Sequence, residues 1–309
     1  MSRKVNRRPR GKNDLTGNKK MYAVSYIMLL PWLLIFILFT LIPIISAVVL
    51  SFSSYDMINA PKFSGMENYI RMLFGDDVFI TALKNTILFA LITGPLGYLL
   101  SFVFAWFISD LNDYARTFFT LLFYIPSLAG NVYMIWNYLF NGDAYGIINS
   151  KLIQLGLIQE PVQWLTDPKY NFWVVVIVVL WMSMGAGFLS FVAGFKQLNP
   201  ELAEAGSIDG ITNRWQELYY VTLPQMVPQL MIGAVLSISG SLAIGVQSST
   251  LTGLPSTDYS THTLLLHIQD MGYGRYEMGY ACAIAVVLFL LMLISWTVIS
   301  HAISRFSSD

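Results

Sequence analysis

Polar side chains inside apolar stretches are the residues of this sequence whose types and spacing could do chemistry. Asparagine, glutamine and serine side chains can form hydrogen bonds, and tryptophan and tyrosine offer flat apolar faces. None of these stretches contains Asp, Glu, Lys or Arg, which disfavours a proton or ion relay and suits a neutral solute. The candidate solute-contacting residues are Asn131, Tyr133, Trp136, Asn137, Trp181, Ser183, Ser237, Ser239, Ser241 and Gln247.

Most of these residues also have a structural interpretation. Trp136 and Asn137 fit an interfacial aromatic belt, and the Ser-Gly-Ser run at 239–241 fits a helix contact built from small residues. Packing is the commoner role for every candidate except Gln247. Two serines follow Gln247 in the outer half of an apolar stretch, so we expect its amide to meet water.

Side chains suited to catalysis or metal binding are few. His262 and His267 are five residues apart, which is the wrong spacing for one helical face, so we expect solvated or packed histidines rather than a metal pair. Cys282 fits a small buried apolar side chain. No Ser-His-Asp, Cys-His or paired-carboxylate arrangement falls at membrane depth, and no G-x-x-x-x-G-K-[ST] motif is present to cradle ATP phosphates. These absences argue against an enzyme.

The elements that position the polar residues are long apolar helices. Of the 309 residues, 55% are apolar and 12% are charged, whereas a soluble domain carries about 25% charged residues. Six charge-free stretches each exceed the roughly 20 residues that a helix needs to cross the hydrocarbon core. We expect an all-α polytopic membrane protein, with a basic tail at 1–20 and a membrane domain at 21–309. The expected spans are 27–52, 85–109, 117–140, 171–195, 226–249 and 278–303.

The distribution of lysine and arginine predicts the orientation of the spans. Eight of the 18 basic residues precede residue 21, and a cytoplasmic N-terminus places 12 basic residues inside and 6 outside. Both termini are therefore expected in the cytoplasm, although a five-span arrangement stays open because most of the difference comes from the tail. We interpret the tail as an arm against anionic lipid headgroups rather than a nucleic-acid-binding arm, because no folded nucleic-acid module accompanies it.

The connection at 196–224 is too long and too regular for a simple linker. Asn199 is a good N-cap, and Pro200 suits the first helical position. Gly210 can stop that helix in the left-handed conformation, and a second short helix is expected at 214–220, ended by the prolines that follow. One face of the first helix carries Leu202, Ala205 and Ile208. We therefore predict a helix–glycine–helix element at the membrane surface.

This connection resembles the EAA loop of permease subunits of bacterial ABC importers. The family pattern is Glu-Ala-Ala, three residues, Gly, about nine residues and Ile-x-Leu-Pro. Here it reads Glu204-Ala205-Gly206, Gly210 and Val221-Thr222-Leu223-Pro224. The runs Pro200-Glu201-Leu202 and Ile208-Asp209-Gly210 are similar to the maltose-type sugar branch. Two departures are Gly206 in place of the second alanine and ten residues between Gly210 and Val221, which leave the register of the second helix open.

The resemblance extends over nearly the whole chain. Runs at 146–149, 155–157, 164–168 and 279–285 are similar to other signatures of the family. The run at 251–253 begins the family's Leu-Thr-Gly-Gly-Gly-Pro pattern, which Leu254-Pro255 then breaks.

The resemblance implies a permease subunit of a binding-protein-dependent sugar importer in the bacterial cell membrane. Its loop would carry a coupling helix that docks on a separate ATPase, which binds ATP and Mg, while this chain binds no cofactor. The implied coupling residues are Glu201, Glu204, Ala205, Gly206, Asp209, Gly210, Leu223 and Pro224. The implied substrate-pathway residues are Asn131, Trp136, Asn137, Trp181, Ser239 and Gln247. The implied partners are two ATPase subunits, a second and different permease, an extracellular sugar-binding protein, a neutral sugar or oligosaccharide and the lipid bilayer, but no nucleic acid.

Two other classes of protein stay open from the residues alone. An ion-coupled secondary transporter or channel for a small neutral solute would usually show intramembrane acids or an internal repeat, and we find neither. An intramembrane enzyme would need reactive side chains at depth.

Overall fold

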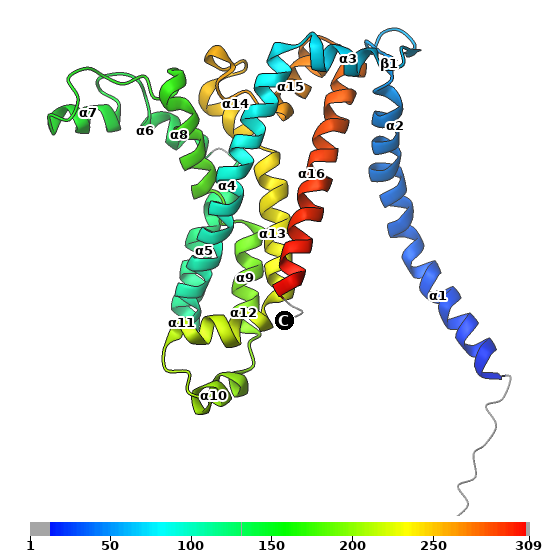
Figure 1. Cartoon of the computed structure of the whole chain (residues 1–309), viewed down its shortest axis with the longest axis vertical. Helices are drawn as coiled ribbons and strands as arrows, with labels where there is room; N and C mark the ends of the chain where they lie inside the picture. Colours follow the sequence, from blue (N-terminus) through cyan, green and yellow to red (C-terminus); the bar gives the residue numbers. More distant parts are fainter. Residues whose placement is uncertain (1–12, 131, 307–309) are drawn as a thin grey trace, which may run out of the picture.

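A computed structural model of the chain describes residues 13–130 and 132–306, and these form helices and one two-stranded hairpin (Figure 1). The elements from the N-terminus are α1 (Asn13–Phe36), η1 (Ile37–Leu41), α2 (Ile42–Leu50), β1 (Ser53–Ser54), β2 (Lys62–Phe63), α3 (Glu67–Phe74), α4 (Asp77–Ser109), α5 (Asp113–Leu128), α6 (Tyr133–Leu139), α7 (Ile147–Gln154) and α8 (Pro168–Trp181). They continue with α9 (Ala186–Lys196), α10 (Pro200–Ile208), α11 (Arg214–Glu217), η2 (Leu218–Thr222), α12 (Leu223–Gln225), α13 (Val227–Leu242), α14 (Val246–Thr252), η3 (Thr257–Tyr259), α15 (Leu264–Gln269), η4 (Asp270–Gly274) and α16 (Met278–Phe306). The predicted tail at 1–20 lies mostly outside the described residues.

Long apolar helices make this chain a multi-pass membrane protein. Within the described residues, the four helical stretches long and apolar enough to cross a membrane are Ser25–Leu50, Asp77–Ser109, Pro168–Lys196 and Met278–His301. Two further pairs of helices qualify only if each bent pair forms one span, namely α5 with α6 and α11–α12 with α13.

The predicted third and fifth spans are not continuous helices. The span expected at 117–140 divides into α5 and α6, which meet at 85°. The span expected at 226–249 ends at Leu242, and α14 is a separate short helix. At this second break Gly245 lies against Leu265, where an added Cβ would be 2.7 Å from Leu265 Cδ2. Glycine at 245 therefore lets the chain pass close to the Leu265 side chain of α15 where the helix is interrupted, and hydropathy cannot reveal such a contact.

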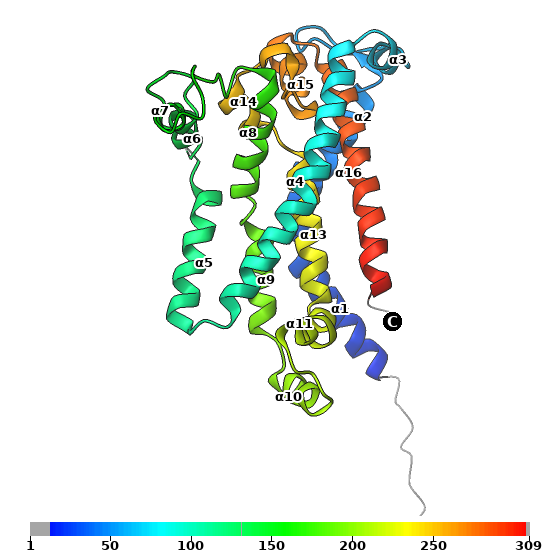
Figure 2. The same ribbon diagram turned by 60° about the vertical axis from the view of Figure 1, so that its left-hand side comes forward.

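The centre of the bundle is formed by α4, α9 and α13, which pack against one another. Contacts of α4 with α5 and α8, and of α13 with α16, extend this centre outward (Figure 2). Gly233 of α13 allows the closest approach, because an added Cβ would lie 2.3 Å from Cζ of Phe191 in α9. The long apolar helices are thus held together by small residues at their crossings.

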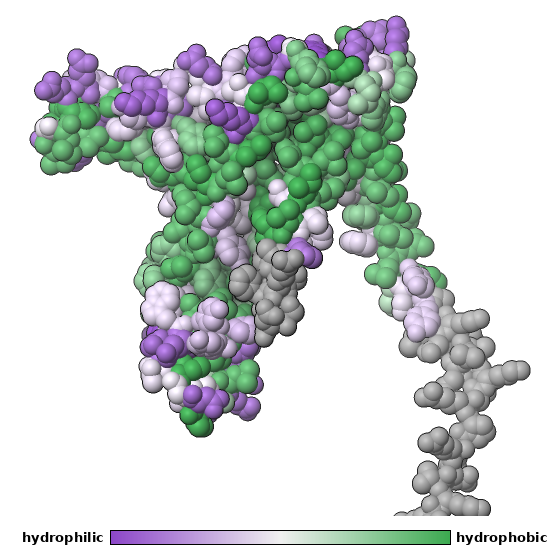
Figure 3. All heavy atoms as spheres, viewed as in Figure 1, coloured by the Kyte–Doolittle hydropathy of each residue, from purple (hydrophilic) through white to green (hydrophobic). Residues whose placement is uncertain are grey.

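The first span departs from this bundle. Its upper part, α2, packs against α16, whereas α1 extends away from the other helices (Figure 1). None of the most apolar residues in Ser25–Leu50 is buried within the chain. Their apolar side chains continue the apolar surface of the bundle (Figure 3), so this helix is covered by lipid or by another protein.

The two ends of the bundle carry different elements. Polar side chains gather at both ends, with an apolar band between them (Figure 3). We call them the α10 end, which carries α10, α11 and α12, and the α15 end, which carries α3, α7, α14, α15 and the hairpin. At the α15 end Asn149 organises the connection around α7, since it accepts a hydrogen bond from Trp164 Nε1 at 2.8 Å and donates one to Val162 O at 3.0 Å.

Candidate functional site

The first candidate site is α10 and the turns that hold it. Asn199 caps the helix, because its Oδ1 accepts a hydrogen bond from Glu201 N at 3.0 Å, and Pro200 lies in the first turn. Gly210 has a φ of +100°, which glycine adopts without the steric cost that a Cβ would add. The N-cap and the left-handed glycine expected from the sequence are both present, and α10 projects from the bundle (Figure 2).

Gly206 explains one departure from the EAA pattern. It is the buried residue of α10, whereas its neighbour Ala205 is exposed. An added Cβ at Gly206 would lie 2.9 Å from Cδ1 of Ile211 and 3.2 Å from Cγ2 of Val221. Glycine therefore lets α10 pack closely on the segment that follows it, and an alanine would require Ile211 to shift.

The remainder of α10 has an unpartnered surface. Leu202 is 48% exposed and Ile208 is 86% exposed. Within the described residues, the carboxylates of Glu201, Glu204 and Asp209 take part in no ion pair. Exposed apolar side chains beside free carboxylates suit a surface that docks on another protein.

The second helix of the loop differs from the prediction. Helical structure continues through α11, η2 and α12 to Gln225, so Pro224 does not end it. Pro224 is tolerated because it lies in the first turn after the π-helical turn η2. Leu223 packs on the apolar cluster at the α10 end, and Gln225 Oε1 accepts a hydrogen bond from Asn199 N at 3.0 Å. The two ends of the loop are therefore joined directly.

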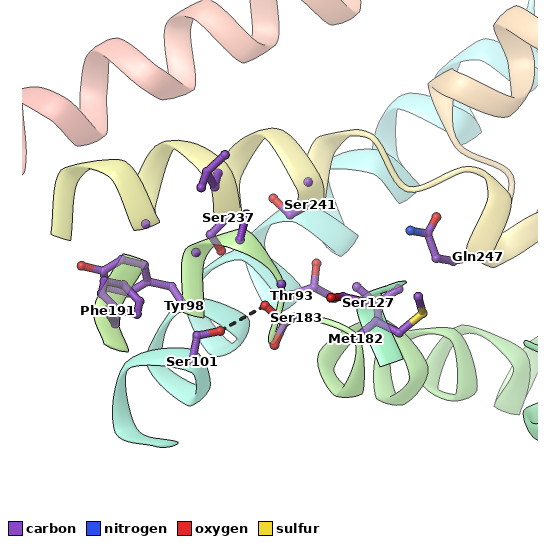
Figure 4. Close-up of a pocket in the computed structure, with 17 residues that line it drawn as sticks. Thr93, Tyr98, Ser101, Ser127, Met182, Ser183, Phe191, Ser237, Ser241 and Gln247 are labelled. Atoms are coloured by element: carbon purple, nitrogen blue, oxygen red, sulfur yellow. Dashed lines mark hydrogen bonds between the residues drawn. The ribbon is translucent and has the colours of Figure 1, made fainter. Parts of the chain in front are cut away.

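The second candidate site is a cavity of about 340 Å³ between α4, α9 and α13. Its lining combines apolar side chains with hydroxyl and amide groups, and it contains no charged residue among those described. Tyr98 and Phe191 lie toward one end and Gln247 lies at the other (Figure 4). The remaining polar lining residues are Thr93, Ser101, Ser127, Ser183, Ser237 and Ser241.

Several cavity hydroxyls donate to backbone carbonyls and keep their lone pairs for a ligand. Ser237 Oγ donates to Gly94 O at 2.8 Å, and Ser101 Oγ donates to Ser183 O at 3.1 Å (Figure 4). Gln247 Oε1 accepts a hydrogen bond from Gly245 N at 3.2 Å, which leaves two amide N–H donors. The cavity can therefore hydrogen-bond a hydroxyl-rich neutral solute and place Tyr98 against its C–H surface.

The structure brings together some of the predicted pathway residues and separates others. Gln247 lines the cavity, as do Ser183, Ser237 and Ser241. The other predicted residues lie elsewhere. Ser239 is exposed, and Asn131 is outside the described residues. Outside the lining are Tyr133, Trp136, Asn137 and Trp181. Residues of α4 were missed, although Thr93 and Ser101 are eight apart and share one helical face.

Trp136 and Trp181 form an aromatic contact between α6 and α8. Their ring centroids are 5.2 Å apart and the rings meet at 76°. Trp136 Nε1 is buried without a hydrogen-bond partner in the described part of the chain, and Asn137 Nδ2 donates to Thr250 O at 3.1 Å. These contacts join α6 to α8 and α14, which is the packing interpretation of the pair.

A buried polar cluster at the α15 end contains both histidines. His262 and His267 are fully buried, with Nε2 of the first 3.4 Å from Nδ1 of the second. Asp76 Oδ2 accepts a hydrogen bond from Tyr280 Oη at 2.6 Å and lies 2.9 Å from His267 Nε2. The two rings meet despite their spacing because His262 precedes α15. The described residues contain no group of three or more His, Cys, Asp or Glu side chains that could hold a metal ion.

The environment of this cluster shifts the pKa values of His262 and Asp76. Burial, together with the neighbouring His267, lowers the pKa of His262 to about 4. Burial raises the pKa of Asp76, but hydrogen bonds from Tyr280 and from Phe79 N, together with His267, outweigh it and hold the pKa below its ordinary value. Asp76 is thus an anionic N-cap for α4 that also holds α15 and α16.

Sequence comparison relates the chain to membrane transport proteins. Residues 95–305 match the family described as binding-protein-dependent transport system inner membrane component. A probable ABC transporter permease of Bacillus subtilis, YesP, is 31% identical over 281 residues, which cover 89% of this chain and 88% of that protein. The lactose transport system permease LacF of Rhizobium radiobacter is 27% identical, covering 89% of this chain and 92% of its own length.

Further comparison extends to an archaeal relative and to the fold. The trehalose/maltose transport system permease MalF of Thermococcus litoralis is 26% identical, covering 96% of this chain and 99% of that protein. A chain of a bacterial ABC transporter involved in import of the acidic polysaccharide alginate superposes with a TM-score of 0.73 at 23% identity, covering 94% of this chain and 99% of that chain. The structural likeness shows a shared fold.

Proposed function

Because the chain belongs to the family of binding-protein-dependent transport system inner membrane components, we propose that it is the permease subunit of an ABC importer for a neutral sugar or oligosaccharide. Relatives named for lactose, arabinooligosaccharide and trehalose/maltose transport support this substrate class. The observation that carries the proposal is α10, a projecting helix in the EAA-type loop with exposed apolar side chains and free carboxylates.

In this proposal α10 is the coupling helix and docks on an ATPase subunit. Glu201, Glu204 and Asp209 offer carboxylates to basic groups of the ATPase, and Ala205 permits close approach. Gly206 and Gly210 shape the turn, and the segment at 223–224 anchors the loop to the bundle. ATP and Mg bind to the ATPase, so hydrolysis occurs outside this chain, which itself carries no cofactor.

The cavity between α4, α9 and α13 is the proposed passage for the solute. Its hydroxyl and amide groups favour a neutral polyol, and its lack of charged lining residues among those described disfavours the alternative, an ion-coupled transporter. Gln247 is the favoured contact. Trp136, Asn137 and Trp181 stay proposed pathway residues although they lie outside the cavity lining, and Ser239 is the weakest candidate because it is exposed.

We further propose six spans in which the α10 end faces the cytoplasm. The two bent helix pairs then count as the third and fifth spans. In this arrangement the basic tail at 1–20 is cytoplasmic and the membrane domain occupies 21–309. The start of α1 and the end of α16 both lie toward the α10 end (Figure 1), which supports placing both termini in the cytoplasm. The excess of basic residues at that end supports the orientation.

The proposed complex contains a second, different permease, two ATPase subunits and an extracellular sugar-binding protein at the α15 end. The apolar surface of α1, which the chain itself leaves uncovered, supports a second membrane subunit. A solved structure with the same fold is a bacterial alginate ABC transporter in complex with an alginate pentasaccharide-bound periplasmic protein, which supports a binding-protein partner.

The proposal is tested by co-expressing the chain with the permease, ATPase and binding-protein genes of its locus. We expect the subunits to co-purify, and a panel of lactose, maltose, trehalose and arabinooligosaccharides to include one that stimulates ATP hydrolysis in proteoliposomes through its binding protein. A chain that transports such a sugar alone, driven by an ion gradient, would contradict it.

A further inference from the structure

Resting on the proposed function, we propose that Arg214 is a positioning residue that ties the coupling loop to the end of α4, through an ion pair with Asp110 and a cation–π contact with Trp106. Asp110 is the C-cap of α4, and Trp106 lies in its last turn. Through this tie, movement of α10 would reach the helix that lines the solute cavity.

The contact has defined geometry on both sides. Arg214 Nη2 pairs with Asp110 Oδ2, and the guanidinium carbon lies 5.0 Å from the centroid of the Trp106 ring. The adjacent Trp215 ring lies 4.8 Å from Trp106 at 61°. Trp106 itself is 7% exposed, so its ring is a fixed platform. The guanidinium is held by a carboxylate at one edge and by an aromatic ring against its face. Such a pair of contacts sets the orientation of the arginine side chain, whereas an apolar contact does not.

The start of α11 is rigid enough to transmit a displacement. Asn213 Oδ1 accepts a hydrogen bond from Gln216 N at 2.9 Å, and Gln216 Oε1 accepts one from Thr212 N at 3.0 Å. This reciprocal capping arrangement fixes the turn that carries Arg214. The turn follows α10 directly through Gly210, so the docking helix and the arginine belong to one short segment.

A cavity beside the ion pair separates part of α11 from α4, which is why the Arg214 contact matters. A cavity of about 200 Å³ lies between the ends of α4 and α9 and the α11–η2 segment, bordered by Asp110, Arg214 and Glu217. The α11 segment is therefore not packed continuously against α4. Apolar packing through Leu218 holds η2 to the bundle, but the polar connection from this loop to the end of α4 runs across the hollow.

From Trp106 the route to the solute cavity is short. Ser101 lies on the same helix about a turn and a half away, and its hydroxyl donates to Ser183 O at the break between α8 and α9. Tyr98 lies one further turn along α4 and also lines the cavity. A rigid displacement of the α4 end would therefore move groups on the cavity wall.

The side chains of Arg214 and Asp110 are 48% and 57% exposed. An ion pair so exposed contributes little to folding, so removing it should leave the protein in the membrane. A loss of coupling can then be separated from a loss of structure, because coupling is measured as solute imported per ATP hydrolysed.

The experiment compares wild type with Arg214→Gln, Asp110→Asn and Arg214→Lys in proteoliposomes holding the complete importer and its binding protein. We expect the two uncharged variants to retain the ATPase but to import roughly two- to tenfold less sugar per ATP. Arg214→Lys should keep most of the yield. Asp110→Arg combined with Arg214→Asp should recover part of it.

Arg116→Gln is the matched control. Arg116 pairs with Asp113 in the same helix and donates from Nη1 to Ser109 O at 3.3 Å, so its contacts stay within the α4–α5 connection. Its yield should match wild type.

Unchanged yield in both Arg214→Gln and Asp110→Asn, in an importer that is ATP-driven, would overturn this inference and leave the proposed function standing. Loss of the ATPase from the Arg214→Gln complex would overturn it in favour of a docking role. If Arg214→Gln fails to accumulate, Asp110→Asn breaks the same pair from α4 and decides the question. A wild-type complex without ATP-driven uptake would overturn the proposed function and this inference together.

Discussion

Gln247 is the cavity side chain with the most hydrogen-bonding capacity left after its protein contacts are counted. Its Oε1 is engaged with Gly245 N, whereas its amide N–H groups face the cavity. We predict that Gln247→Leu raises the sugar concentration for half-maximal uptake about five- to thirtyfold, because one or two hydrogen bonds to solute are lost at roughly 1 kcal/mol each. Uptake kinetics at equal expression measure this effect.

Ser239→Ala is the control for that prediction. Ser239 is on the helix that precedes Gln247 but is exposed rather than part of the cavity lining, so its kinetics should match wild type. Unchanged kinetics for Gln247→Leu would show that the amide does not contact the solute.

His262 makes the stability of the α15 end depend on pH. Its pKa is about 4 in the folded protein and near 6.5 when unfolded. The unfolded chain therefore binds more protons between these values, and stability falls as the pH falls through this window, by up to about 1.4 kcal/mol per pH unit. The groups that act on it are His267, Asp76, Asp270 and Arg275.

Thermal unfolding in detergent at pH 7.5, 6.5, 5.5 and 4.5 tests this prediction. His262→Phe keeps an aromatic ring but removes the proton site, so its midpoint should fall less steeply than that of wild type over the same range. Asp76 has a pKa below its ordinary value of 3.8, so its own contribution is lost only below this range. Identical slopes in the two proteins would rule out His262 as the source.

At the scale of elements, α10 projects from the bundle, so a substitution in it can change docking without changing the fold. Alanine is the best helix former and Glu204 is exposed, so Glu204→Ala should leave folding within about 0.5 kcal/mol of wild type. We predict that it weakens ATPase retention roughly tenfold, because a docking carboxylate is removed. Co-purification of the ATPase at increasing salt measures the change. Glu160→Ala, an exposed acid at the α15 end, should retain the ATPase fully.

Gly210 controls the direction in which α10 projects. Its φ of +100° is strained for a side chain, most of all a β-branched one. We predict that Gly210→Val accumulates in the membrane but lowers stimulation of ATP hydrolysis by loaded binding protein several-fold, whereas Gly210→Asn, which tolerates positive φ better, loses less. Equal stimulation in all three proteins would mean that this turn does not position the coupling helix.

At the scale of the whole molecule, the proposed orientation separates two sets of exposed positions. In a Cys282→Ser background, cysteines at Ser207 and Asp209 of the α10 end should resist a membrane-impermeant thiol reagent in intact cells. Cysteines at Tyr145 and Leu157 of the α15 end, which are 96% and 68% exposed, should react. Permeabilised cells provide the control, since all four should then be labelled. Labelling of Ser207→Cys in intact cells would show that the α10 end faces the outside, opposite to the proposed orientation.

The sequence alone determined the class of this protein and the local form of its loop. Apolar runs of spanning length, the basic N-terminal tail and the Asn199–Gly210 pattern each depend on neighbouring residues, and local physics is enough to interpret them. The EAA-type residues indicated the family, and the match of residues 95–305 to that family then established it. Gln247 could be selected because an amide among serines is costly in lipid unless it faces a cavity.

Only the tertiary structure decided which residues share a site. The bend between α5 and α6 and the break at 243–245 depend on how the chain bends and on close contacts, not on hydropathy. The cavity wall includes Tyr98 and Ser101 of α4, where the spacing of polar residues alone does not show which helices they face. Asp76 meets His267 across 191 residues of chain, and Arg214 meets Asp110 across a hollow. Such contacts depend on how distant helices cross, which no local pattern encodes.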